Sequence, residues 1–353
     1  MMRLPGLDRK TVIGVDIGSH SIKMVEVKVE KDRPTITRAG YMRMDISIER
    51  EGEVRRCLKE LLSLIRPTTK KCIADIPSSD EMVIMRTMFI PEASPSMSDE
   101  EMIEATRSEV EEQDYLPYPI DKALVSSDLL GRVTMEGEKG IEVFFVAVHK
   151  ELPEERARML RKLGLRVLAI DVDSLALARL IGMMRIASDE ENVAVADMGA
   201  SKTSLFFYLR GYPLFYPHIP IGGVKLTEEI SRRLNVKWAE AERMKEELND
   251  ERVKEALISA MKRPDGLIQS LKSRFEYHMA DYPPPQRVIL TGGLSQLPFM
   301  VELLSSELSL PVERIRYLDR FDLDRRGEGV KEVVDNQALF ATAIGLALKV
   351  MAE

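Results

Sequence analysis

Two short segments of the chain place an aspartate two residues before a glycine, in each case directly after a predicted buried strand. They are Asp16-Ile-Gly18 and Asp197-Met-Gly199. A glycine at this position permits a tight hairpin turn in which backbone N–H groups come close to a ligand. Successive N–H groups in such a turn form a concave site for anions. The two segments therefore predict a pair of turns that hold phosphate groups.

The side chains around the first turn suit the same chemistry. Ser19 and Ser21 add hydroxyl donors, and Lys23, on the strand that follows, is placed to neutralise a β- or γ-phosphate. A carboxylate beside phosphates repels them unless a cation lies between the two. Because Mg2+ uses few protein carboxylates and keeps several waters, we predict that Asp16 and Asp197 hold hydrated Mg2+.

Further residues complete the candidate site. Gly292 and Gly293 follow a predicted strand and precede a helix, and the absence of side chains leaves room for an adenine–ribose unit against the backbone. Gly222 and Gly223 are predicted to lie near the phosphates at the entrance to a helical region, and Thr203 opens the strand after the second turn. A lone Asp-x-Gly segment is more often a simple hairpin. Two copies in equivalent places favour a nucleotide site in a duplicated fold.

The elements that must position these residues alternate between predicted strands and helices, which is typical of α/β layers. The final helix, 335–351, is apolar on more than one face and is expected inside the body of the protein. We expect a first half formed by 1–88, 150–187 and 335–353, an inserted subdomain at 89–149, a second half formed by 188–224 and 286–334, and a helical subdomain at 225–285.

The bulk properties limit the classes of protein. With 353 residues, two domains are expected. A net charge of -7 argues against nucleic acid as a partner. No stretch approaches the roughly 20 apolar residues that span a bilayer, so we expect a cytoplasmic protein that reaches a membrane through a partner or a surface. The two cysteines lack metal-ligand spacing and are expected to be ordinary thiols.

The motifs resemble those of a large superfamily. Segments 12–23, 193–204 and 288–298 are similar to the phosphate-1, phosphate-2 and adenosine motifs of the actin/Hsp70/sugar-kinase (ASKHA) superfamily, and 337–347 resembles its second connecting helix. The resemblance implies an actin-like ATPase fold, with two duplicated RNase H-like halves that clamp ATP and Mg2+.

A narrower resemblance comes from the insert. Segments 89–92, 99–109, 115–121 and 219–230 are similar to the type IV pilus assembly protein PilM family, whose insert occupies the position found in the cell-division protein FtsA. This resemblance implies a cytoplasmic ATP-binding platform, peripheral at the inner face of the inner membrane, that docks the N-terminal tail of the membrane protein PilN. It also implies that 89–148 form one wall of the docking groove. Self-association stays open.

Alternatives from other classes remain. FtsA proteins usually continue into an amphipathic membrane helix, and the type II secretion protein GspL continues into a transmembrane helix; the sequence shows neither segment. A stand-alone GspL-like component, an FtsA-like filament-forming protein and a small-molecule kinase of the sugar-kinase type are the alternatives. The kinase needs an acidic base in the cleft that the sequence does not reveal.

Hydrolysis of ATP is expected to be slow or absent. The alignment places Val172 where the Hsp70 branch has a catalytic carboxylate. Asp171 and Asp173 flank it, and the alternation of side chains along a strand turns them elsewhere unless the alignment slips by one residue. Two minor expectations concern His20, predicted to face solvent, and the charged run 239–247, predicted to be an ordinary solvated helix.

Overall fold

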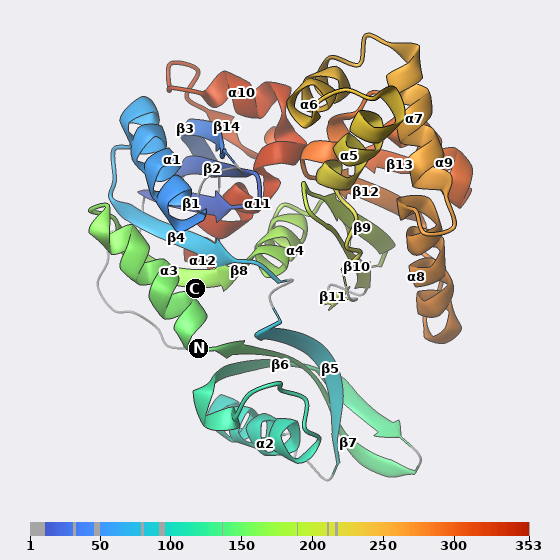
Figure 1. The fold of residues 1–353 in the computed structure, drawn as a ribbon. Helices are drawn as coiled ribbons and strands as arrows, with labels where there is room; N and C mark the ends of the chain where they lie inside the picture. Colours follow the sequence, from blue (N-terminus) through green and yellow to red (C-terminus); the bar gives the residue numbers. More distant parts are fainter. Residues whose placement is uncertain are drawn as a thin grey trace.

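The structure, a computed structural model, contains two halves that each surround a mixed sheet, with a separate small sheet below them and a group of helices to one side (Figure 1). It describes residues 11–30, 33–45, 50–78, 81–91, 96–135, 137–188, 190–209, 212–215 and 218–352. No helix within these ranges is long and apolar enough to cross a membrane.

The first sheet has six strands in the order β14-β3-β2-β1-β4-β8. Their bounds are β1 Thr11–Ile17, β2 Ser21–Glu30, β3 Arg33–Arg43, β4 Lys71–Ile76, β8 Arg166–Val172 and β14 Asp322–Leu323. Strands β1, β2 and β3 form an antiparallel meander, whereas β4 and β8 run parallel to β1.

The second sheet repeats this arrangement in the order β11-β10-β9-β12-β13. Its strands are β9 Asn192–Met198, β10 Thr203–Leu209, β11 Tyr212–Phe215, β12 Arg287–Thr291 and β13 Val312–Arg314. Again three strands form an antiparallel meander, and the last two run parallel to the first. The duplicated α/β fold predicted from the two Asp-x-Gly segments is confirmed.

Two pairs of helices cover the first sheet. Helices α1 (Arg50–Ile65) and α3 (Glu151–Lys162) pack on one face, and α4 (Asp173–Met183) and α11 (Gln337–Ala347) pack on the other. Helix α11 is buried along almost its whole length, as its apolar sequence predicts. It lies between β1 and α4, so it is the central element of the first half.

The remaining elements form the helical subdomain, the insert and the connections. The helical subdomain contains α5 Gly223–Leu234, α6 Trp238–Glu247, α7 Glu251–Lys262 and α8 Leu267–Asp281. The insert contains β5 Val83–Pro91, α2 Asp99–Glu112, η1 Ile120–Lys122, β6 Ala123–Met135 and β7 Glu138–His149, with the sheet order β5-β7-β6. The connections contain η2 Gly293–Gln296, α9 Met300–Leu308, η3 Leu318–Arg320, α10 Val330–Asp335 and α12 Lys349–Ala352.

Two expected boundaries differ from the structure. All of β5 pairs with β7, so the insert begins at Val83 and not at 89. Strand β14 pairs with β3, and α10 also packs against β3, so residues 322–335 belong with the first half. Pairing between strands far apart in the sequence decides both boundaries, and local composition does not reveal it.

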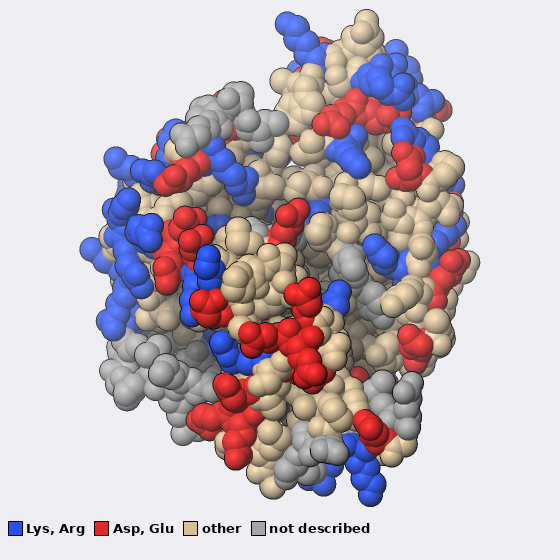
Figure 2. Space-filling model, turned by 60° about the horizontal axis from the view of Figure 1, so that its bottom comes forward, with Lys and Arg blue, Asp and Glu red and all other residues tan. Residues whose placement is uncertain are grey.

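The surface charge is uneven. Figure 2 shows Lys and Arg side chains gathered along the left-hand side of the view, the side on which α1 and α3 lie in Figure 1. Acidic side chains gather nearer the middle of the same view. The net charge of -7 therefore conceals a basic region on the first half.

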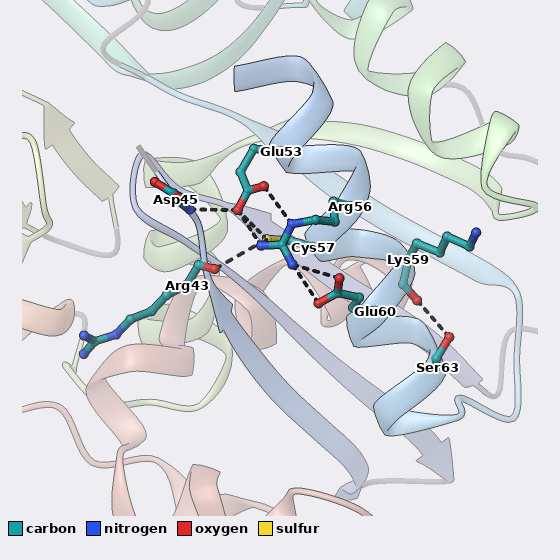
Figure 3. Close-up of polar contacts among 8 residues, drawn as sticks. All are labelled: Arg43, Asp45, Glu53, Arg56, Cys57, Lys59, Glu60 and Ser63. Carbon is teal, nitrogen blue, oxygen red and sulfur yellow. Dashed lines mark hydrogen bonds and ion pairs between the residues drawn. The ribbon is translucent and has the colours of Figure 1, made fainter. Parts of the chain in front are cut away.

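A buried carboxylate joins α1 to the end of β3 (Figure 3). Glu53 is 2% exposed, accepts the backbone N–H of Asp45 at 2.7 Å and receives two hydrogen bonds from Arg56, at 2.6 and 2.8 Å. The thiol of Cys57 also donates to it at 3.4 Å. The bonds from Arg56, followed by that from Asp45, lower the pKa of Glu53 to about 2.

We expect Glu53→Gln to lower the melting temperature at pH 7. The carboxylate of Glu53 has a depressed pKa in the folded state, so its contribution is present above the unfolded pKa of about 4.3 and is lost as the pH falls toward 2. The difference in melting temperature from the parent should therefore narrow between pH 5 and pH 3. Glu60→Gln is the control: Glu60 also pairs with Arg56 but is exposed, so little change is expected. A Glu53→Gln difference that is constant with pH would contradict the assignment.

Candidate nucleotide site between the two halves

A cavity of about 650 Å3 lies between the halves and is lined by residues from both of them. This volume is within the range of small-molecule sites. Of the predicted site residues, the cavity is lined by Asp16, Gly18, Ser19, Ser21, Lys23, Asp197, Gly199, Gly223, Gly292 and Gly293. Gly222 and Thr203 lie behind it. The sequence segments that carried the prediction thus meet in one place.

The first turn connects β1 to β2 and is held by its own backbone. The N–H of Gly18 donates to the carbonyl oxygen of Ser21 at 3.1 Å, and Asp16 and Lys23 are register partners on the two strands. Lys23 Nζ lies 3.2 Å from Asp16 Oδ2. From the start of α1, Arg50 donates to the carbonyl oxygens of Gly18 and Ser19, at 3.3 Å each. The turn is therefore braced before any ligand binds.

The second turn supports the start of α5. The N–H of Gly223 donates to the carbonyl oxygen of Gly199 at 3.0 Å. A Cβ on Gly222 would lie 2.5 Å from the carbonyl oxygen of Ala200, so only glycine permits this contact. The hydroxyl of Thr203 is buried and donates to the carbonyl oxygen of Ile221 at 2.9 Å. Gly222 and Thr203 thus position the turn from behind.

The third glycine segment touches the second turn. Gly292 has a φ of 81°, a conformation that favours glycine. Its N–H donates to the carbonyl oxygen of Ala338 at 3.0 Å, and a Cβ there would lie 2.6 Å from Asp197 Oδ1. Gly292 therefore leaves room for the second carboxylate.

One expectation about the acidic residues is wrong. Asp173 lines the cavity, with Oδ1 accepting the N–H of Ser78 at 2.9 Å and Oδ2 lying 3.3 Å from Lys202 Nζ. Val172 is the last residue of β8, and Asp173 begins α4, so strand alternation stops between them. Asp171 does turn elsewhere: it is buried and lies 2.6 Å from Arg179.

A further carboxylate, Asp75, also lines the cavity and was not predicted. It lies near the end of β4, which runs parallel to β1, and its Oδ1 accepts the N–H of Ile17 at 2.9 Å. Burial, and then the negative charge of Asp16, raise the pKa of Asp75 to about 8. Because parallel neighbours end at the same edge of a sheet, an aspartate late in the predicted strand 71–76 was an available signal.

The carboxylates around the cavity fit a bound cation. Burial, and then the charges of Asp173 and Asp16, raise the pKa of Asp197 to about 6. A divalent cation would relieve this repulsion, and carboxylate oxygens are the donors that Mg2+ takes. Among the residues that the structure describes, no group of three or more His, Cys, Asp or Glu side chains could hold a metal ion. Mg2+ would therefore keep waters or phosphate oxygens as ligands.

The helical subdomain supplies two charged residues that the sequence interpretation missed. Glu242 and Lys245 of α6 both line the cavity. Lys245 is buried, and its Nζ donates to the carbonyl oxygen of Gly223 at 3.1 Å, to Thr227 Oγ1 at 2.7 Å and to Glu242 Oε2 at 2.7 Å. The expectation of an ordinary solvated helix is wrong for this face of α6. Charge spacing alone does not distinguish a face that lines a cavity from one that faces solvent.

Residues that line the cavity, among them His20, Arg43 and Glu246, also join the first half to the helical subdomain. The rings of His20 and Trp238 lie 5.8 Å apart, and Arg43 is ion-paired with Glu246. His20 is half-buried and does not face open solvent as expected. Burial is the main cause of its lowered pKa.

Comparisons with known proteins agree with this architecture. A family model described as type IV pilus assembly protein PilM matches residues 14–351. The solved structure of a PilM–PilN type IV pilus biogenesis complex is similar with a TM-score of 0.80 and 26% identity, over 96% of this chain and 98% of that chain. The ethanolamine utilization protein EutJ from Carboxydothermus hydrogenoformans is similar with a TM-score of 0.57 and 14% identity, over 98% and 90% of the two chains.

A third similar structure is MreB5 of Spiroplasma citri bound to ADP, with a TM-score of 0.52 and 9% identity over 97% of each chain. The matches to EutJ and MreB5 show the fold alone. Together with the strand orders of the two sheets, they confirm the predicted actin-like ATPase fold.

Proposed function

The chain belongs to the PilM family of type IV pilus assembly proteins, and from this premise we propose that it is an ATP- and Mg2+-binding scaffold. In this role it docks the cytoplasmic N-terminal tail of an inner-membrane partner of PilN type and lies at the inner face of the membrane. The main support for nucleotide binding is that two Asp-x-Gly turns and a glycine pair all line one cavity. The similarity to the PilM–PilN complex supports the docking part.

We propose a role for each group around the cavity. Backbone N–H groups of the two turns, with Lys23 and Lys202, would hold the phosphates, and Gly292 and Gly293 would accept the adenosine unit. Mg2+ when bound neutralises the phosphate charge that the carboxylates would otherwise repel.

The hydrogen-bond partners of the acidic residue nearest the expected catalytic position support slow hydrolysis of ATP. Phosphoryl transfer to water needs a group that orients the attacking water. Asp173, which follows the aligned position Val172, lines the cavity. However, Lys202 and the N–H of Ser78 already occupy its carboxylate oxygens. We therefore propose binding with slow turnover.

The insert contacts both halves, which gives the nucleotide a route to the docking surface. Phe144 of β7 packs against Phe215 of β11 with ring centroids 5.6 Å apart. On the other side, Val83 and Val148 share a cluster with Ile76 of the first half. A ligand that stabilises one arrangement of the halves would favour one arrangement of the insert.

The proposed groove predicts a residue for partner docking. Leu124 is 50% exposed on β6, an edge strand of the insert sheet, and is paired in register with Val148 at the junction with the first half. A tail that docks here would cover this side chain, and an edge strand also offers backbone groups to an extended peptide. We expect Leu124→Asp to weaken binding of a synthetic PilN-type tail by about tenfold or more, measured by fluorescence anisotropy.

The control for this measurement is Met279→Asp, since Met279 is 45% exposed on α8, outside the insert. It should bind the tail as the parent does. Equal binding by parent and Leu124→Asp would place the tail elsewhere. Failure of the parent to bind any such tail would remove the docking proposal.

A further inference from the structure

The strand ends opposite the nucleotide cavity carry a concentration of basic residues. Two stretches, 61–74 and 156–170, contain three and five Lys or Arg residues and no Asp or Glu, although the whole chain has a net charge of -7. The eight residues are Arg66, Lys70, Lys71, Arg156, Arg158, Arg161, Lys162 and Arg166. Arg156 is the exception in position, because it is partly buried and its charge interacts with Asp75 at the cavity. Such a local excess in an acidic protein indicates a surface for an anionic partner.

The fold brings the two stretches together along one edge. Strand β4 follows α1, β8 follows α3, and the two strands are parallel neighbours in which Lys71 is the register partner of Arg166. The N–H of Arg166 also donates to the carbonyl oxygen of Lys70 at 2.7 Å. We define the basic edge as Arg66, Lys70, Arg161, Lys162 and Arg166, all of them exposed. This edge lies on the side where Figure 2 shows gathered Lys and Arg side chains.

The preference for cations at helix C-termini accounts for only some of the basic residues of this edge. Arg161 and Lys162 lie in the last turn of α3, where cations are favoured. Lys70 and Arg166 lie outside the helices. None of the five residues of the basic edge is ion-paired with another residue of the described ranges, whereas Arg55 of α1 is paired with Glu51.

An exposed leucine accompanies the basic edge. Leu64, in the last turn of α1 and two residues before Arg66, is 58% exposed. A large apolar side chain among unpaired cations is the composition of surfaces that rest in the interface of a bilayer. Anionic headgroups attract such surfaces, and each basic residue near them strengthens the attraction.

We propose that the basic edge is a lipid-contact surface, at which the cations face anionic headgroups and Leu64 enters the interface. The nucleotide cavity lies at the opposite ends of β1, β4 and β8, and the insert joins α3 at its N-terminal end, so lipid contact leaves both free. This inference rests on the proposed function in one respect, namely that the protein works close to a membrane. It gives the scaffold a direct contact in addition to the one through its partner.

The test is flotation of the full chain, without nucleotide or partner tail, on vesicles of phosphatidylcholine with or without phosphatidylglycerol. We expect binding only to vesicles with phosphatidylglycerol, and loss of that binding as salt shortens the Debye length. The variant Lys70→Glu/Arg161→Glu/Lys162→Glu should bind at least about tenfold more weakly. Leu64→Ser should also weaken binding, although it leaves the charge unchanged.

The control variant Lys225→Glu/Arg233→Glu/Lys237→Glu changes the net charge equally but alters exposed positions of the helical subdomain. It should bind the vesicles more strongly than the basic-edge variant. Equal losses in both variants, or no binding by the parent, would overturn the proposal. Displacement by millimolar glycerol phosphate would overturn it as well, because it would indicate a site for one small anion. Since neither ATP nor the tail is present, these outcomes are independent of the proposed function.

Discussion

Asp16→Ala should abolish the thermal stabilisation of the protein by ATP and Mg2+. At a concentration 100 times its dissociation constant, a ligand that binds only the folded state adds roughly 2.7 kcal/mol of stability. Asp16 faces the cavity beside Lys23 and is one of the two carboxylates assigned to Mg2+. Its loss removes a cation ligand and leaves the phosphate charge uncompensated. The measurement is the melting temperature across a titration of ATP with Mg2+.

Asp197→Ala should also lose the thermal stabilisation by ATP and Mg2+, but its melting temperature without ligand should differ from that of Asp16→Ala. Burial, and then neighbouring carboxylates, raise the pKa of Asp197, so its ionisation at pH 7 destabilises the folded state relative to the unfolded chain. The ligand-free variant should therefore melt at or above the parent, which separates loss of binding from loss of folding. Asp128→Ala, at an exposed position of the insert, is the control and should respond to ATP as the parent does.

The same samples test whether ATP is hydrolysed slowly. Phosphate release by the parent protein should remain slow at saturating ATP. Rapid release would contradict a scaffold and favour an enzyme. Stabilisation that persists in both the Asp16 and Asp197 variants would place the nucleotide elsewhere. A parent that is free of carried-over nucleotide and shows no response would leave a PilM-family fold without the ligand.

Gly14→Ala should destabilise the folded state by about 3 kcal/mol or more, at the upper end of the cost of overpacking. Gly14 lies in β1, at the centre of the first sheet, where α11 crosses it. A Cβ there would lie 1.8 Å from the backbone carbonyl oxygen of Ala343 and 3.0 Å from the N of Ala347. Backbone atoms cannot rotate away, so β1 and α11 would have to separate. Chemical denaturation would measure the change.

Gly131→Ala is the matched control for this prediction. Gly131 also lies in a strand, β6, but an added Cβ there would meet no atom within 4 Å. Its stability should stay within about 0.5 kcal/mol of the parent. A stability equal to that of the parent in Gly14→Ala would contradict the close approach of β1 and α11 at this position.

The sequence by itself determined the duplicated halves and most of the residues that we propose to hold phosphate. Asp16 and Asp197 each follow a buried strand and precede a glycine, and this local chemistry needs no distant partner to be interpreted. The final predicted helix, 335–351, is apolar on more than one face, and this pattern likewise predicted that it lies inside the protein. These features depend on neighbours within a few residues, so the chain order already contains them.

Tertiary structure alone decided which other side chains reach the cavity. Asp75 lines it because β4 is a parallel neighbour of β1, and Asp173 lines it because the strand ends one residue before it. Lys245 lines it because the start of α5 rests on the second turn. The boundaries at Val83 and at residues 322–335 and the assembly of the basic edge have the same origin. Each depends on pairing between segments far apart in the sequence, which local composition and periodicity do not encode.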